Sequence, residues 1–313
     1  MKSAGFPETP KKALISAVKQ YPFYAKVPLV EDKESINFRF GAVSQRFVTA
    51  NDREMGGIRL FRVMWELPLF SGSDLDRETL SFLNRINQFS PVSPLVYEPR
   101  GHLYKLAIRI RVNPDNLSLM TQLLPQLGAL QVLTAKKILE QKQEPISLKR
   151  AGDFDAASLK ALEKFEVELK EAGSSPSSRW EGVELFSAAA GLEATFKEPP
   201  KADLTSLRLS FPFMDSTSDF LLDTKQTDPW LGKGIHAETF FKTNGNEADN
   251  LQMAATLNAV SFNEDVDHNC LGSLFAEQNG LRHRVFIPNA FFAEDLAQHL
   301  CSNAYLLSAE EQG

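Results

Sequence analysis

The sequence predicts an α+β protein built from two tandem copies of one module. Each copy is a helix, three strands, a helix, two strands and a helix around a mostly antiparallel sheet. Two observations predict this. The order of strand-like and helix-like segments in the first half recurs in the second half. In addition, "GHLYKLAIRIRVNP" from Gly101 and "GLRHRVFIPN" from Gly280 each begin with glycine and carry basic residues at alternate positions. Coincidental strand–helix rhythm is the alternative explanation.

The first module is assigned to residues 1–143. A helix is expected from Thr9, because a threonine N-cap followed by proline favours a helix start, and Pro22 ends it. The segments "INFRF", "QRFVTA" and "IRLFRVMWELP" are predicted strands, with "REMGG" as the turn before the third. The third strand places four apolar side chains on one face: Phe61, Val63, Trp65 and Leu67.

In the rest of this module, the spacing of apolar residues changes from every second position to every third or fourth position. Apolar spacing after Asp74 predicts a helix that closes on "FLNRIN", followed by strands at 95–98 and 103–112. A last helix is expected after Asn116. Because proline lacks the backbone N–H, we expect Pro125 to kink or interrupt this helix before it resumes to about Gln143.

Residues 144–178 are predicted to link the modules. They contain a charged amphipathic helix followed by "SSPSSR", the most linker-like stretch of the chain. The apolar stripe of this helix consists of Leu159, Leu162, Phe165 and Leu169. The sequence leaves open which module the helix packs on.

The second module is assigned to residues 179–313 and repeats the order of the first. "WEGVELFSAAAG" is helical, and "LRLSFPF", "DFLLDTKQ" and "IHAETFFKT" are the three strands. A helix closes on Leu257-Asn258, as the earlier one closes on Leu83-Asn84. A hairpin around Gly280 and a helix at 291–307 complete the copy.

Composition excludes several classes of protein. A net charge of −6 argues against nucleic acid as the main partner, because phosphate binding needs clustered Lys and Arg. Cys270 and Cys301 are too few for a disulfide scaffold, which favours a reducing compartment. The sequence shows neither a signal peptide nor a run long enough to cross a bilayer. We therefore expect a cytoplasmic protein with no membrane or nucleic-acid partner.

Signatures of catalysis and of cofactor binding are scarce, so we predict no catalytic residue and no cofactor. Gly232-Lys233-Gly234 lacks the spacing of a phosphate loop and is interpreted as a turn. No nucleophile elbow occurs, and no pair of acidic residues stands in an apolar setting.

We also predict no metal site. His268 and Cys270 would share a strand face, but His299 and Cys301 point apart on a helix, so buried cysteines and exposed histidines are the simpler interpretation. Asp265, Asp267 and Asn269 have calcium-loop spacing but lack the glycine and the final glutamate of such a loop. They are interpreted as a polar loop.

Two basic strips occupy corresponding strands and are candidate partner-binding residues. They consist of Lys105, Arg109 and Arg111 in the first module and Arg282 and Arg284 in the second. An exposed row of guanidinium groups binds carboxylates in a bidentate manner, which suggests an acidic peptide or subunit. The alternative is an ordinary solvated sheet face whose cations pair with nearby Asp and Glu.

Phenylalanine is the dominant aromatic residue, with 23 copies, and many lie in predicted strands. The adjacent Phe240 and Phe241 place one ring on each face of the sheet, so the second face must also be covered. Packing between the modules, another subunit or a client peptide would cover it.

The order of elements, carried by "LSFLNRIN…GHLYKLAIRIRVNP" and "MAATLN…GLRHRVFIPN", resembles the type III secretion chaperone-like fold, including the YbjN-like family of bacterial proteins. This resemblance implies protein binding, often by homodimers that hold extended client segments in apolar grooves. Joining two modules covalently would build that dimer arrangement within one chain. The expected state is a monomer with pseudo-dimeric halves, or a homodimer.

Our main hypothesis is a non-enzymatic, chaperone-like protein that binds an extended segment or partner subunit at strand edges and Phe-lined surface. An enzyme or small-ligand binder that uses a cleft between the modules is the alternative. A buried polar cluster at the cleft would favour that alternative, and a continuous apolar interface would favour the main hypothesis. A third hypothesis is a regulatory subunit whose basic strip, with Arg109 and Arg111, docks an acidic partner.

Overall fold

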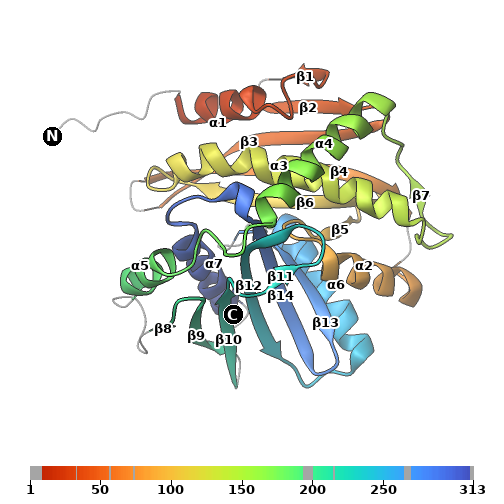
Figure 1. Cartoon of the computed structure of the whole chain (residues 1–313). Coiled ribbons are helices and arrows are strands. Elements are labelled where there is room, and N and C mark those ends of the chain that lie inside the picture. Colours follow the sequence, from red (N-terminus) through yellow and green to blue (C-terminus); the bar gives the residue numbers. More distant parts are fainter. Residues whose placement is uncertain are drawn as a thin grey trace.

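Two antiparallel sheets flanked by helices make up the chain, as the computed structural model in Figure 1 shows. The structure describes residues 9–32, 34–55, 58–72, 75–192, 200–213, 216–263 and 269–310. Within these ranges, no helix combines the length and the apolar character needed to cross a membrane.

The first module has the predicted order of elements, with one short strand, β1, that was not predicted. Its bounds are α1 (Thr9–Gln20), β1 (Leu29–Glu31), β2 (Ser35–Phe40), β3 (Val43–Met55), β4 (Ile58–Ser71), α2 (Arg77–Phe89), β5 (Leu95–Glu98), β6 (Leu103–Val112) and α3 (Leu117–Gln141). Asp76 caps α2 because its carboxylate accepts a hydrogen bond of 2.8 Å from the Thr79 N–H.

The second module repeats this order, with one additional short strand, after the linking segment, which contains β7 (Lys149–Arg150) and α4 (Ala156–Gly173). Its bounds are α5 (Val183–Leu192), β8 (Lys201–Ala202), β9 (Ser206–Phe213), β10 (Ser216–Asp223), β11 (Thr227–Asp228), β12 (Gly232–Lys242), α6 (Glu247–Asn263), β13 (Ser273–Glu277), β14 (Gly280–Pro288), the 3-10 turn η1 (Asn289–Phe291) and α7 (Leu296–Glu310). The short strands β8 and β11 were not predicted, and β11 is the additional strand.

The strand order confirms the duplication. The first sheet runs β1-β2-β3-β4-β6-β5, and the second, taken from its other edge, runs β8-β9-β10-β12-β14-β13. Each of the six strands along one path therefore has a counterpart at the same place in the other, while β7 and β11 lie off these paths. Every pairing along both paths is antiparallel.

The expected interruption of the third helix and several expected boundaries are wrong; for example, the last helix begins at Leu296 rather than at Phe291. Pro125 lies inside the uninterrupted α3, because a buried helix tolerates one missing N–H donor when packing fixes it on both sides. Residues 53–55 of the expected turn belong to β3, which pairs with β4 up to Met55↔Ile58. Helix α6 continues past Asn258 to Asn263.

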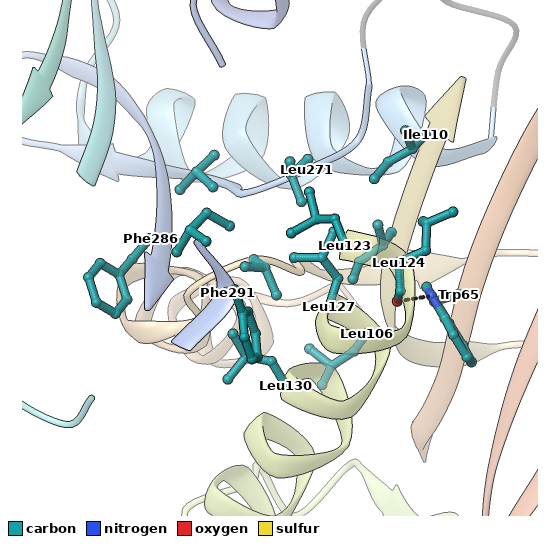
Figure 2. Packing of buried hydrophobic residues seen from close by; sticks show 14 of the residues in the cluster. Trp65, Leu106, Ile110, Leu123, Leu124, Leu127, Leu130, Leu271, Phe286 and Phe291 are labelled. Atoms are coloured by element: carbon teal, nitrogen blue, oxygen red, sulfur yellow. Dashed lines mark hydrogen bonds between the residues drawn. The ribbon is translucent and has the colours of Figure 1, made fainter. Parts of the chain in front are cut away.

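The two modules share one hydrophobic core. Trp65 of β4 is fully buried, and its Nε1 donates to the Leu124 carbonyl of α3 at 3.0 Å. Figure 2 shows leucines of α3 in the same cluster as Leu271 and Phe291 of the second module. Apolar burial is the main favourable term in folding, so a common core predicts that the modules unfold together.

Helix α4 answers the question that the sequence left open, because it packs on both modules. Phe165 is buried, with its ring 5.2 Å from that of Phe23 in the first module and 6.3 Å from that of Phe291 in the second. At the end of α4, an added Cβ on Gly173 would lie almost on the Leu231 carbonyl oxygen, so only glycine allows this approach. The linking helix is therefore part of the core.

Candidate partner-binding groove

The modules join through reciprocal backbone contacts at the inner ends of the short edge strands. The Arg109 N–H of β6 donates to the Cys270 carbonyl of the second module at 3.0 Å. The Phe286 N–H of β14 donates to the Pro91 carbonyl of the first module at 2.8 Å. Pro91 lies four residues before Leu95, and Cys270 lies four residues before Leu274. The segment before the short edge strand of each module therefore binds the sheet of the other module. The junction thus has the symmetry of a two-fold dimer.

An asparagine closes the outer edge of each short edge strand. The Asn87 side chain of α2 accepts from the Leu95 N–H of β5 at 2.7 Å and donates to its carbonyl at 3.4 Å. The Asn258 side chain of α6 does the same for Leu274 of β13, at 3.0 and 2.7 Å. Asn87, rather than Asn84, is therefore the counterpart of Asn258, which corrects the sequence alignment of the two copies.

Asn84 of the first module binds the backbone of Ala276 in the second module. Its side chain accepts from the Ala276 N–H of β13 at 2.6 Å and donates to the Ala276 carbonyl at 3.2 Å. Ala276 follows Leu274 by two residues, as Tyr97 follows Leu95, and Asn84 precedes Asn87 by three, as Ala255 precedes Asn258. Helix α6 thus presents a methyl group where α2 presents an amide.

A groove lies where α6 carries Ala255 in place of the asparagine that α2 carries at the equivalent position. It has a volume of about 330 Å³ and lies between α6 and the β5 end of the first module. None of its lining residues carries a charge at neutral pH: Leu75, Tyr97, Pro99, Gln252, Ala255, Thr256, Ala259, Val260 and Asn263. The side chains of α6 in this set are mostly small, and they recur at helical spacing on one face. The groove is therefore a neutral, largely apolar surface beside a strand edge.

The predicted cationic residues form two equivalent ion clusters. Lys105 Nζ lies 2.9 Å from a Glu66 carboxylate oxygen and 3.4 Å from one of Glu98. In the second module Arg282 lies 3.0 Å from Glu238 and 2.7 Å from Glu277. Both cations lie on the strand between the strands of their two glutamates, so each cluster joins three strands of a sheet.

The expectation that the first strip faces solvent is wrong. Lys105 is 6% exposed and Arg109 2% exposed, because α6 and the chain around Cys270 cover this face of the sheet. Lys105 Nζ lies 4.7 Å above the Phe262 ring of α6, and the Arg111 N–H donates to the Asn269 side chain at 2.9 Å. These basic residues take part in the junction between the modules.

The two arginines of the second strip are partly exposed, and both form ion pairs with glutamates of the same sheet. Arg284 lies 2.9 Å from Glu238 and donates to the Gln88 carbonyl of α2 at 3.2 Å. Phe240 lies partly exposed beneath the Arg282 guanidinium, whereas Phe241 is buried with α6. One ring therefore lies on each face of the sheet, as the alternation predicts.

The cysteines and histidines form no metal site among the described residues. Both thiols are unpaired and buried, and burial raises the pKa of Cys270 to about 12, so it stays protonated at neutral pH. The His283 ring contacts the Leu271 carbonyl at 2.9 Å. His268, Asp265 and Asp267 lie outside the described residues.

Replacing Asn84 with alanine is expected to lower the free energy of unfolding by about 1–2 kcal/mol. The change removes two hydrogen bonds and leaves both Ala276 backbone groups without the amide. Urea unfolding measures the loss. Ser81→Ala on the exposed face of α2 is the control, with an expected change of about 0.5 kcal/mol or less. Equal effects of the two substitutions would contradict the assigned role of Asn84.

Comparison with models of known protein families, with curated proteins and with solved structures returned no match.

Proposed function

We propose that this chain is a non-enzymatic, chaperone-like binding protein that holds an extended segment of a partner protein in the groove between α6 and β5. The proposal rests on one difference between the two modules. Helix α2 closes the edge of β13 with the Asn84 side chain, whereas α6 has Ala255 at the equivalent position and leaves a groove beside Tyr97. The resemblance to the type III secretion chaperone-like fold and the YbjN-like family points to the same class of function.

The groove suits an extended segment in two ways. Asn87 closes the outer edge of β5 at Leu95, but the part of this edge beside Tyr97 borders the groove, and a partner backbone would run along the strand there. Ala255, Ala259 and Val260 on the other side leave room for a bulky apolar side chain of the partner. In an extended segment only alternate side chains face one way, so we expect apolar residues at every second position.

The alternative, an enzyme or small-ligand binder at a cleft between the modules, has less support. Its mark would be a buried polar cluster that opens into a cleft. The buried Lys105 at the junction is instead paired with Glu66 and Glu98 beneath α6, and the lining of the groove is uncharged. Of the residue types that act as general acids or bases, the groove lining contains Tyr97 alone. Binding is the better match to these surroundings.

The proposal extends to assembly and location. Reciprocal contacts at Cys270 and Pro91 build the two-fold arrangement within one chain, which supports a monomer with pseudo-dimeric halves. Two buried, unpaired thiols are compatible with the reducing cytoplasm. Sedimentation equilibrium distinguishes the monomer from a homodimer.

Ala255→Asn is expected to weaken partner binding tenfold or more. The new amide would reproduce on α6 what Asn84 does on α2, filling the groove beside Tyr97 while adding hydrogen bonds to the junction. The partner is first identified by cross-linking in cells, and its affinity is then measured with purified proteins.

Met253→Asn is the matched control, because Met253 is 40% exposed and lies outside the groove lining. It should bind the partner like the wild type. Hydrogen exchange should show protection of β5 residues on binding. Wild-type affinity of Ala255→Asn, or no protection of β5, would rule out this groove as the binding site.

A further inference from the structure

We infer that one side of the junction between the modules is sensitive to pH: protonation of His236 opens the contact between Phe286 of the second module and Pro91 of the first. This inference goes beyond the groove and does not depend on it. The observation that carries it is a buried histidine ring without a hydrogen-bond partner. His236 of β12 is 5% exposed, and both of its ring nitrogens are buried with no donor or acceptor among the described residues.

A histidine in these surroundings is stable only in its neutral form. Buried polar atoms are nearly always hydrogen-bonded, because leaving water without a new partner costs free energy. That cost is larger for the imidazolium ion, which carries a charge and two N–H donors, than for the neutral ring. Burial accordingly lowers the pKa of His236 below its ordinary value of 6.5. Protonation therefore requires the ring to reach water.

The charged neighbours of His236 do not supply a partner for the cation. Against the effect of burial, the carboxylates of Asp228 in β11, Glu238 in β12 and Asp223 in β10 favour the protonated ring. Arg284 of β14 opposes it. Two arginines already bind Glu238, and backbone N–H groups of the following turns donate to Asp223 and Asp228. Burial outweighs the three carboxylates, so the pKa of His236 stays lowered.

Phe286 connects His236 to the junction. The two residues lie opposite each other in the register of β12 and β14, and their ring centroids are 4.5 Å apart. Phe286 is 1% exposed and belongs to the shared core (Figure 2). Its N–H donates to the Pro91 carbonyl of the first module at 2.8 Å. We expect the protonated ring to reach water by displacing Phe286, which breaks the bond to Pro91.

The first module shows that the fold does not need a histidine at this place. Met64 lies opposite Arg109 in the register, as His236 lies opposite Phe286. Met64 and His236 each stand two positions before the glutamate of their own ion cluster. Met64 packs beside Cys270, whose carbonyl accepts the Arg109 N–H. Because methionine does not titrate, the two equivalent contacts of the junction should respond differently to acid.

Acid should favour the open contact. A group whose pKa is lower in the closed form stabilises that form above the pKa of the open form, and the contribution is lost as the pH falls. With a pKa of 6.5 for the ring in water, the equilibrium constant for opening should rise below about pH 6.5. One proton limits this rise to about tenfold per pH unit, so we expect about three- to tenfold more opening at pH 5.5 than at pH 7.5.

Hydrogen exchange of two backbone amides in the full-length protein tests this, measured by NMR and corrected for the intrinsic pH dependence of exchange. Opening at the Phe286 amide should increase about three- to tenfold between these pH values. The Arg109 amide, which donates to the equivalent Cys270 carbonyl, is the internal control and should change less than about twofold. His236→Met copies Met64 of the first module and should remove the pH dependence at Phe286. His236→Leu is a second variant with the same expected result.

Equal changes at the two amides would overturn the inference, as would the wild-type pH dependence in His236→Met and His236→Leu. NMR of the wild-type protein with labelled histidine gives a further readout, the titration midpoint of the His236 ring. A midpoint at or above pH 6.5 would also overturn the inference. Ala255→Asn should keep the pH response of the Phe286 amide, so failure here leaves the groove unaffected.

Discussion

Replacing Glu166 with glutamine is expected to lower the free energy of unfolding by about 3 kcal/mol at neutral pH. Glu166 lies on α4 with its side chain 9% exposed, and it binds Lys170 at 2.8 Å and Lys137 of α3 at 3.1 Å. The Trp230 Nε1 of the second module donates to the same carboxylate at 3.0 Å. Glutamine would leave these cations near an uncharged amide at the point where α4 joins both modules.

The effect of this substitution should depend on pH. Burial alone would raise the pKa of Glu166, but hydrogen bonds from Lys170, Trp230 and Lys137 outweigh it and lower the pKa from 4.5 to about 2. A carboxyl group whose pKa is lower in the folded state stabilises the fold above its unfolded pKa and loses that contribution as the pH falls. The stability difference between wild type and variant should therefore shrink between about pH 4.5 and about pH 2.

Urea unfolding at a series of pH values measures both effects, with Glu168→Gln as the control. Glu168 lies on the same helix, is 57% exposed and pairs at 3.6 Å with Lys164. Its replacement should cost about 0.5 kcal/mol or less at any pH, as expected of an exposed pair. If the Glu166 variant lost no more stability than the Glu168 variant, the Glu166 carboxylate would not stabilise the contact between α4 and the two modules.

Gly128→Ala is expected to destabilise the protein by about 3 kcal/mol, because the middle of α3 approaches the aromatic cluster too closely for a side chain. A Cβ at this position would lie 2.5 Å from a ring carbon of Trp65 and 2.6 Å from the Tyr24 hydroxyl. Both neighbours are fully buried, with stacked rings 5.5 Å apart. In addition, the Gly128 carbonyl accepts from the Gln45 side chain at 2.8 Å, so the helix cannot retreat without breaking that bond.

Gly191→Ala in α5 is the control for helix propensity. Its Cβ would meet only the flexible end of Gln298, at 3.0 Å, on an exposed part of the helix. Because alanine favours helices over glycine, this variant should gain about 0.5 kcal/mol. Thermal unfolding compares the two. A Gly128 variant as stable as the wild type would mean that α3 does not lie as close to Trp65 as described.

Local pattern was sufficient for most of the fold. The alternation in β6 and in the hairpin around Gly280 predicted strands with buried and polar faces, and the recurring order of elements predicted two modules. Pattern failed where packing overrides local preference, as at Pro125 inside α3. It also misaligned the copies, since Asn84 and Asn258 both follow leucine, but Asn258 binds β13 of its own module whereas Asn84 binds β13 of the other module.

The candidate surfaces depended more on the tertiary structure. Alternation placed Lys105 and Arg109 on the polar face of β6, but it could not show that the other module covers this face. The groove was found by comparing Ala255 of α6 with Asn84 of α2. These residues lie far apart in the chain, and a single sequence does not report which of them occupy equivalent places in the fold.

The sequence by itself determined the two copies, their class and the strands that carry charge, because periodicity and turn residues act over a few neighbouring positions. Only the tertiary structure decided which charges are neutralised and which strand edges are closed. Those outcomes depend on the junction, where Asn84 reaches Ala276 and Glu166 reaches Trp230 across the module boundary. Contacts of this kind form only when the shared core brings distant segments together.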